Sequence, residues 1–198
     1  MKKTRALIAA MLLGAVTLLL AAPASAARPD PSPVGSMGIP KDAVSLKASS
    51  VRPLAAVHLW FADSLKCIDN PNYSTVSGTW LDQWSCVDQT NELWFLDYGF
   101  TAGGYDFFRI RNAYSGLCVN IQGGSGADGA PVIQYTCGDY ANEYFVFWAD
   151  ANVPTPFYWV QAYSSGKVIN VTGGDDANGA KLIQYFRCYC TNEYVALY

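Results

Sequence analysis

Short stretches of apolar and polar residues recur along the chain with a fixed period. The run from Ser115 to Tyr144 returns at Ser165 to Tyr194, and a looser copy stands at Ser64 to Leu93. Corresponding positions are offset by 51 and then 50 residues. Three tandem copies of one unit indicate a repeat architecture, in which neighbouring copies bury a shared core.

Each copy contains four short segments rich in aromatic and β-branched residues, with Gly-containing breaks between them. This pattern is typical of strands joined by turns, and helical signals are weak. The predicted strands are 58–61, 67–68, 81–84 and 94–96, then 107–110, 118–119, 132–135 and 145–147, then 157–160, 168–169, 182–185 and 195–197. Closing a sheet removes its exposed edges. We therefore predict an all-β barrel of twelve short strands with internal threefold symmetry.

One trio of residues keeps its spacing in every copy. A short Asp or Asn is followed by an aromatic residue 15 positions later and by an Asn 7 positions after that. A packing role would favour apolar residues at all three positions, so the combination favours a surface site that is made three times. The alternative is that these residues cap turns, but a turn cap needs no aromatic partner. The trios are Asp69, Trp84 and Asn91; Asn120, Tyr135 and Asn142; and Asn170, Tyr185 and Asn192.

The cysteines follow the same repeat. Two pairs, each separated by 19 positions, stand at equivalent places in the first two copies. One loop-closing disulfide per copy is the natural pairing in a secreted chain. The predicted bonds are Cys67–Cys86 and Cys118–Cys137.

The third copy breaks this pattern. Val168 and Arg187 replace its two cysteines, while Cys188 and Cys190 stand nearby. These two could pair with each other, stay free or bond to another chain. Two cysteines and the distant His58 are too few ligands for a metal site, so we expect neither a metal nor another cofactor.

The N-terminal part differs from the rest in composition. Lys2, Lys3 and Arg5 precede an apolar run and the small residues 24–26. This order predicts a secretory signal peptide over residues 1–26 and a secreted protein. Its apolar run is too short and too rich in Ala to favour a membrane span.

Residues 27–55 are rich in Pro and Ser, and no aromatic residue precedes Trp60. We predict a flexible N-terminal arm or linker there. Residues 56–198 then form one domain, with copies at about 56–103, 104–153 and 154–198. Without the three N-terminal cations, 10 basic residues face 16 acidic ones, which is a net charge of −6. Nucleic acid and anionic membrane surfaces are therefore not expected partners.

The motifs of the first copy resemble those of ricin B-type lectins. Cys-x-Asp at Cys67, Gln-Trp-x-Cys at Gln83 and Asn-Glu-x-Trp at Asn91 look like that family's pattern. The resemblance covers residues 56–198 and implies a β-trefoil, a fold also used as a carbohydrate-binding module in secreted bacterial enzymes. It further implies that each trio binds a sugar, commonly galactose-like or xylose-like. Where the family usually has a Gln that supports the Asp, this chain has Glu92, Glu143 and Glu193.

Copies two and three also lack the family's Asp, which Asn120 and Asn170 replace. An amide gives up the stronger charge-assisted hydrogen bonds of a carboxylate. We expect an exchange of roles, with Glu143 holding Asn120 and Glu193 holding Asn170. Each pair then keeps one charge and one amide.

In the first copy Asp69 and Glu92 would be two carboxylates without an amide, so one is expected to be protonated or turned away. They are also the pair that a glycosidase would need. An enzyme needs one site, however, whereas this pattern is made three times, so we expect no catalysis. We predict a monomeric, secreted carbohydrate-binding protein with up to three sugar sites, acting multivalently on polysaccharide or surface glycans. The alternative is a secreted trefoil that binds a protein partner or inhibits an enzyme through loops such as 97–106, with degenerate sugar sites.

Overall fold

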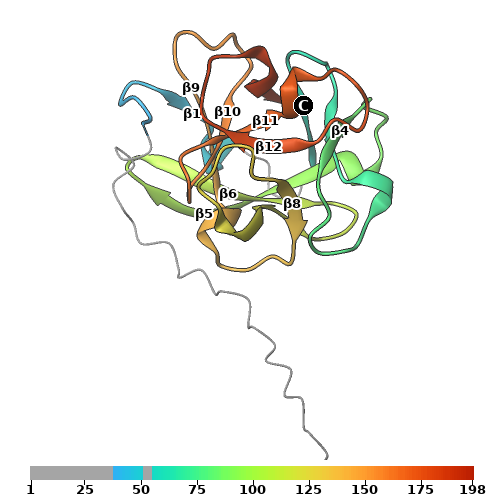
Figure 1. The fold of residues 1–198 in the computed structure, drawn as a ribbon. Coiled ribbons are helices and arrows are strands. Elements are labelled where there is room, and N and C mark those ends of the chain that lie inside the picture. The colour runs from blue at the N-terminus through green and yellow to red at the C-terminus, as the bar shows by residue number, and fades with distance from the viewer. Residues whose placement is uncertain (1–37, 51–54) are drawn as a thin grey trace, which may run out of the picture.

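Twelve strands, four from each copy, make up the repeated part of the computed structural model, which describes residues 38–50 and 55–198 (Figure 1). The prediction of twelve short strands is confirmed. They are β2 (Val57–Phe61), β3 (Cys67–Asp69), β4 (Asp82–Trp84) and β5 (Leu93–Ala102); β6 (Tyr105–Asn112), β7 (Cys118–Ile121), β8 (Val132–Tyr135) and β9 (Phe145–Ala149); and β10 (Trp159–Ala162), β11 (Val168–Val171), β12 (Leu182–Tyr185) and β13 (Val195–Leu197).

The helices of the described residues are single 3-10 turns, and none of them is long and apolar enough to cross a membrane. Apart from η2, which precedes the first copy, each copy places one turn after its second strand and one before its last strand. They are η2 (Ala48–Ser50), η3 (Pro71–Tyr73), η4 (Thr90–Glu92), η5 (Gln122–Gly124), η6 (Ala141–Glu143), η7 (Thr172–Gly174) and η8 (Thr191–Glu193).

The first and last strands of the copies form a closed barrel. β2 pairs with β13 and β5, β6 pairs with β5 and β9, and β10 pairs with β9. A bridge between Tyr158 and Val195 completes the ring. The hairpins β3–β4, β7–β8 and β11–β12 lie across one end of the barrel, joined by bridges such as Trp80–Ile133 and Pro131–Ile183. A barrel capped by three equivalent hairpins is a β-trefoil.

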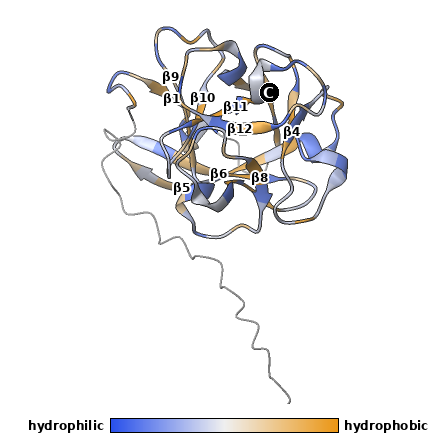
Figure 2. Ribbon diagram, in the orientation of Figure 1, coloured by the Kyte–Doolittle hydropathy of each residue, from blue (hydrophilic) through white to orange (hydrophobic). Residues whose placement is uncertain are grey.

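The core repeats the same symmetry in layers, because alternate residues of each strand face inward. Figure 2 shows apolar strands at the centre and hydrophilic turns around them. Equivalent positions of the three copies are fully buried together: Leu59, Ile110 and Val160 in one layer, and Leu81, Val132 and Leu182 in another.

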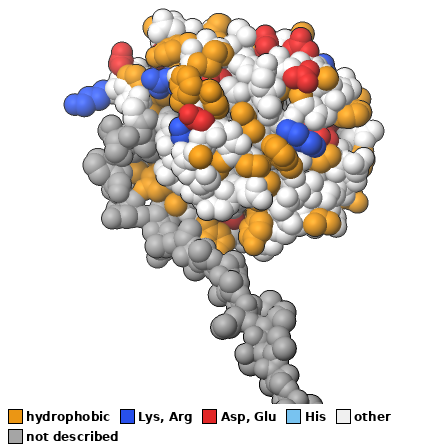
Figure 3. Space-filling model, viewed as in Figure 1, with side chains coloured by type: hydrophobic (Ala, Val, Ile, Leu, Met, Phe, Trp, Pro, Cys, Tyr) orange, Lys and Arg blue, Asp and Glu red, His pale blue; other side chains and the backbone are white. Residues whose placement is uncertain are grey.

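On the face drawn in Figure 3, the Lys and Arg side chains are few and stand apart.

A buried glutamine in each copy fixes the cap hairpins to one another. The Oε1 atom of Gln134 accepts a hydrogen bond from Ser115 at 2.7 Å. Its Nε2 atom donates to the carbonyl oxygens of Ser74 and Val76 at 2.8 and 3.2 Å. These carbonyls belong to the preceding copy, so the three copies interlock in a ring. The same contacts are made by Gln83 with Ser64, Asp175 and Ala177, and by Gln184 with Ser165, Ser125 and Ala127.

Part of the predicted arm lies against the barrel, so a flexible arm is the wrong description for residues 38–50. The strand β1 (Val44–Ser45) pairs with β9, with Ser45 opposite Trp148. Ile39 is buried. Main-chain pairing with a strand and one buried aliphatic side chain hold this segment without any aromatic residue. The predicted signal peptide and residues 27–37 lie outside the described residues.

The stretch 97–106, expected as an exposed loop, is mostly the hairpin of β5 and β6. Gly103 and Gly104, with φ of 56° and 86°, form its two-residue turn, which is the backbone that tight hairpins favour. The amide of Ala48 donates to Oδ2 of Asp106 at 2.9 Å. The N-terminal segment therefore contacts the hairpin and covers part of the surface that was expected to be open to a protein partner.

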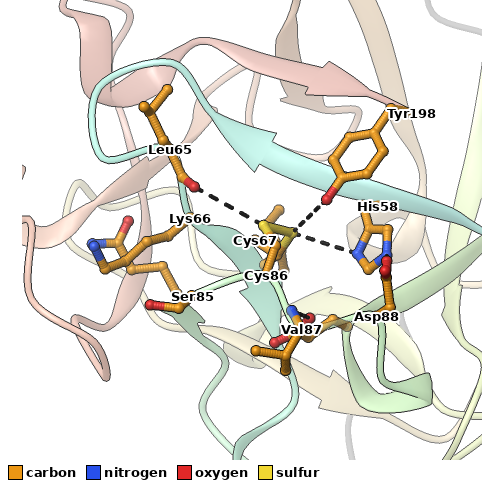
Figure 4. Close-up of a disulfide and its surroundings, with 12 residues drawn as sticks. His58, Leu65, Lys66, Cys67, Ser85, Cys86, Val87, Asp88 and Tyr198 are labelled. Atoms are coloured by element: carbon orange, nitrogen blue, oxygen red, sulfur yellow. Dashed lines mark hydrogen bonds and ion pairs between the residues drawn. A yellow bond between two sulfur atoms is a disulfide. The ribbon is translucent and has the colours of Figure 1, made fainter.

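Both predicted disulfides, Cys67–Cys86 and Cys118–Cys137, are present. Figure 4 shows the first of them beside His58 and Tyr198, whose rings stack at 4.8 Å. Nδ1 of His58 lies 3.4 Å from Sγ of Cys67. His58, Cys67 and Glu92 bring possible metal-ligand atoms within 4.8 Å of one another, but this sulfur is bonded to Cys86 and cannot serve as a thiolate.

The third copy uses different interactions in place of its missing disulfide. The guanidinium of Arg187 lies over the rings of Trp148 and Trp159, at 4.8 and 5.0 Å from their centroids. Such cation–π contacts stabilise a partly desolvated cation. Cys188 and Cys190 pair with each other, which resolves the pairing that the sequence left open.

Candidate functional site

Three elements meet at each trio. In the first copy, Asp69 ends β3, Trp84 ends β4 and Asn91 lies in η4. Register explains the spacing: Cys67 lies opposite Trp84 in the hairpin, and side chains two apart on a strand share a face. Asp69 and Trp84 are therefore diagonal neighbours. The other trios have the same placement: Asn120 in β7, Tyr135 ending β8 and Asn142 in η6; Asn170 in β11, Tyr185 ending β12 and Asn192 in η8.

The two polar residues of each trio are hydrogen-bonded. Nδ2 of Asn91 donates to Oδ1 of Asp69 at 2.5 Å. Equivalent bonds join Asn142 to Asn120 at 2.9 Å and the third pair at 3.0 Å. The same Nδ2 atom also donates to a backbone carbonyl in every copy. The second amide therefore uses both of its N–H groups within the protein and keeps only its oxygen for a further partner.

Glutamates hold the first amide in copies two and three, as expected. Nδ2 of Asn120 donates to Oε1 of Glu143 at 3.2 Å, and the equivalent distance from Asn170 to Glu193 is 3.3 Å. The other carboxylate oxygen of Glu143 accepts the amide of Gly138 at 2.8 Å. Burial raises the pKa of both glutamates, while the backbone hydrogen bonds to Gly138 and Cys188 oppose that shift.

The aromatic residues present their rings to solvent. Trp84 is 45% exposed, and Tyr135 and Tyr185 are partly exposed. The first residue of each trio is nearly buried, at 4 to 5% exposed. Each site thus combines an open ring with the edge of a fixed polar pair.

Each site also depends on a neighbouring copy. The amide that follows the ring donates to a side chain of the preceding loop: Thr136 to Ser77 at 3.1 Å and Phe186 to Asp128 at 2.9 Å. In the first copy Ser85 donates to Asn178 at 3.0 Å. The rings are therefore positioned by the threefold assembly and not by one repeat alone.

Besides Asp69 and Glu92, the first copy carries a third carboxyl group at its site, which the repeat pattern did not predict. Asp82 lies opposite Asp69, where the other copies have Ile133 and Ile183. Both carboxyl groups are buried, and Nζ of Lys181, from the third copy, donates to Oδ2 of Asp82 at 2.8 Å. The sequence contains a signal for Asp82, which stands where the other two copies have an isoleucine. It also contains a signal for the buried glutamines, which recur at the same position of every copy.

Asp69 responds strongly to this environment. Burial, followed by the negative charges of Asp82 and Glu92, raises the pKa of Asp69 to about 7. Glu92 is turned to the amide of Val87, which donates to its Oε2 at 2.8 Å. The sequence led us to expect repulsion between the carboxylates of Asp69 and Glu92. In the structure Glu92 accepts a hydrogen bond from the backbone of Val87, and Asp69 takes up a proton near neutral pH.

The pKa of Asp69 gives a pH-dependent prediction. A carboxyl group whose pKa is higher in the folded than in the unfolded state binds its proton more tightly when folded, so stability falls as pH rises from about 4 to about 7. Asp69→Asn, which copies the residue of the other two sites, should remove the part of this fall that Asp69 contributes. Between pH 4 and pH 8, the free energy of unfolding of the variant should fall by up to ~4 kcal/mol less than that of the wild type. Urea unfolding across this range measures it, with the exposed Asp176→Asn as control. Parallel stability curves for wild type and Asp69→Asn would contradict the assignment.

The fold and the repeated site together define a β-trefoil of the lectin type. The family described as "Ricin-type beta-trefoil lectin domain-like" matches residues 48–135 and 100–185. The chain belongs to this family. No curated protein matches the chain in sequence.

Solved structures share the fold. The designed threefold-symmetric protein ThreeFoil is 27% identical, with a TM-score of 0.66 over 72% of this chain and 96% of its own. The exo-β-1,3-galactanase 1,3Gal43A of Clostridium thermocellum is 24% identical, with a TM-score of 0.66; the match covers 74% of this chain but 30% of the galactanase. The ricin B-like lectin of Macrolepiota procera, solved with lactose, is 16% identical, with a TM-score of 0.57 over 75% of this chain and 97% of the lectin.

Proposed function

We propose that the protein is a secreted, monomeric carbohydrate-binding protein with up to three sugar sites, which act together on polysaccharide or surface glycans. The proposal rests on the trio, which is built three times with the same spacing: an aromatic ring, exposed at Trp84 and partly exposed at Tyr135 and Tyr185, lies beside a hydrogen-bonded polar pair. The disulfides are consistent with an extracellular setting.

The chemistry of the trio suits a pyranose. A sugar ring has an apolar C–H face, which an aromatic side chain can cover, and a rim of hydroxyl groups. In copy two, the oxygen of Asn142 can accept a hydroxyl hydrogen, while Asn120 is fixed by Glu143. Galactose-like or xylose-like sugars are the class that the family resemblance implies, and the lactose complex of the Macrolepiota lectin supports testing galactosides first.

We propose no catalytic role for the carboxyl groups of the first site. Glycoside hydrolysis places two carboxyl groups about 5 Å or more apart, across the bond that is cut. Asp69 and Asp82 lie opposite each other in the β3–β4 hairpin, and Glu92 accepts a hydrogen bond from the backbone of Val87.

The test removes each ring in turn. Trp84→Ala, Tyr135→Ala and Tyr185→Ala should each delete one weak site and leave the fold intact, because the rings lie outside the core. We expect sub-millimolar to millimolar binding at each site, about −4 to −5 kcal/mol. Isothermal titration with galactose, lactose and xylose counts the sites, and circular dichroism checks the fold. A triple variant that binds these sugars as the wild type does would refute the proposal.

A further inference from the structure

The turn beside the trio keeps its backbone in all three copies but not its residues. In copies two and three it is Gly123–Gly124, with φ of 64° and 61°, and Gly173–Gly174, with φ of 67° and 63°. The first copy has the same left-handed backbone at Asn72 and Tyr73, with φ of 54° and 53°. Glycine adopts this conformation freely and Asn tolerates it, but it is unfavourable for a bulky side chain. Strained residues of this kind cluster at functional sites.

The position of Tyr73 is next to the proposed sugar site. A side chain at Gly174 would begin 3.8 Å from Nδ2 of Asn192 and would otherwise enter open space, and Gly124 has the equivalent position in copy two. By the repeat, the side chain of Tyr73 begins beside Asn91. The oxygen of this amide is buried and has no hydrogen-bond partner among the described residues, an unsatisfied acceptor next to this turn.

The ring of Tyr73 belongs to an exposed aromatic pair. It packs edge-on against Tyr114, with ring centroids 5.0 Å apart and an angle of 79°. Tyr73 is 38% exposed and Tyr114 is 48% exposed. At the position of Tyr114 the other copies have Asp63 and Ser164. Only the first site, therefore, has additional rings at these two positions.

We propose that Tyr73 and Tyr114 form a second aromatic subsite at the first trio, so that this site binds an oligosaccharide through two consecutive sugar units. Trp84 covers the first sugar, and the tyrosine pair covers an apolar face of the next one. Sites two and three, with glycine at the turn, each hold one sugar unit. The inference rests on the proposed sugar-binding function and adds the length of the ligand at one site.

The test isolates the first site. In a protein carrying Tyr135→Ala and Tyr185→Ala, the affinities for galactose and xylose are compared with those for β-linked galactotriose and xylotriose by isothermal titration. Tyr73→Gly, which copies the other turns, and Tyr114→Ser, which copies Ser164, should each weaken trisaccharide binding by roughly 3- to 10-fold. Monosaccharide affinity should stay the same. The melting temperature of Tyr73→Gly should not fall, because the left-handed backbone suits glycine.

Two outcomes distinguish the subsite from the site itself. Unchanged or tighter trisaccharide binding by Tyr73→Gly overturns the subsite, and tighter binding would mean that the ring covers the site. Trp84→Ala in the same background should abolish binding of both sugar lengths. If it does not, or if the background protein binds no sugar at all, the proposed function fails at this site independently of Tyr73.

Discussion

Tyr135→Ala should weaken binding to an insoluble polysaccharide by about tenfold or more, while the remaining sites keep their affinity for the monosaccharide. The three trios occupy equivalent places around the threefold axis, so we expect that one short oligosaccharide cannot bridge two of the proposed sites. A polymer or a glycan-covered surface can, and the second contact then forms at high effective concentration. Losing one of three sites therefore reduces polymer binding by much more than one third.

Depletion from suspensions of insoluble galactan and xylan measures this effect, and titration with the monosaccharide provides the reference. The matched control is Tyr198→Ala, since Tyr198 is also an exposed tyrosine, 59% exposed, but lies outside the trios. Equal affinity for polymer and monosaccharide in the wild type would mean that a single site works and that binding is not multivalent.

Restoring the family's usual residues in copy two should show strong coupling between Asn120 and Glu143. Glu143→Gln alone leaves one acceptor for two donors, the amide of Gly138 and Nδ2 of Asn120. Asn120→Asp alone places a second buried carboxylate beside the first. Each single change should cost ~1–3 kcal/mol of stability. The double variant satisfies every group again, because the new amide donates to the new carboxylate and accepts from Gly138.

The double variant should therefore unfold within about 0.5 kcal/mol of the wild type, giving a large coupling energy in the mutant cycle. It should also bind sugar about fivefold more tightly at this site, because a carboxylate accepts stronger hydrogen bonds from hydroxyl groups than an amide does. Urea unfolding of the four proteins measures the first effect. Titration in a Trp84→Ala and Tyr185→Ala background measures the second. Additive losses of stability would contradict the exchange of roles.

The threefold β architecture, the two disulfides of 19-residue spacing and the composition of the three trios could all be predicted from the amino-acid sequence. These features are periodic, and a period of about 50 residues is visible without knowing any contact. The exchange between Asn120 and Glu143 was also predictable, because it depends on which donors and acceptors two neighbouring positions offer.

Tertiary structure alone decided the features that break the repeat or cross between copies. Asp82 accepts a hydrogen bond from Lys181 of another copy. Burial and the negative charge of Asp82 raise the pKa of Asp69. Tyr73 has no aromatic counterpart in the other two copies, so the repeat does not point to it. Its left-handed backbone and its contact with Tyr114 are visible only in the structure. Residues 38–50 pack through main-chain pairing with β9, for which composition gives no signal. Such contacts depend on register and on how the copies are arranged around the axis, and neither is encoded in a local pattern.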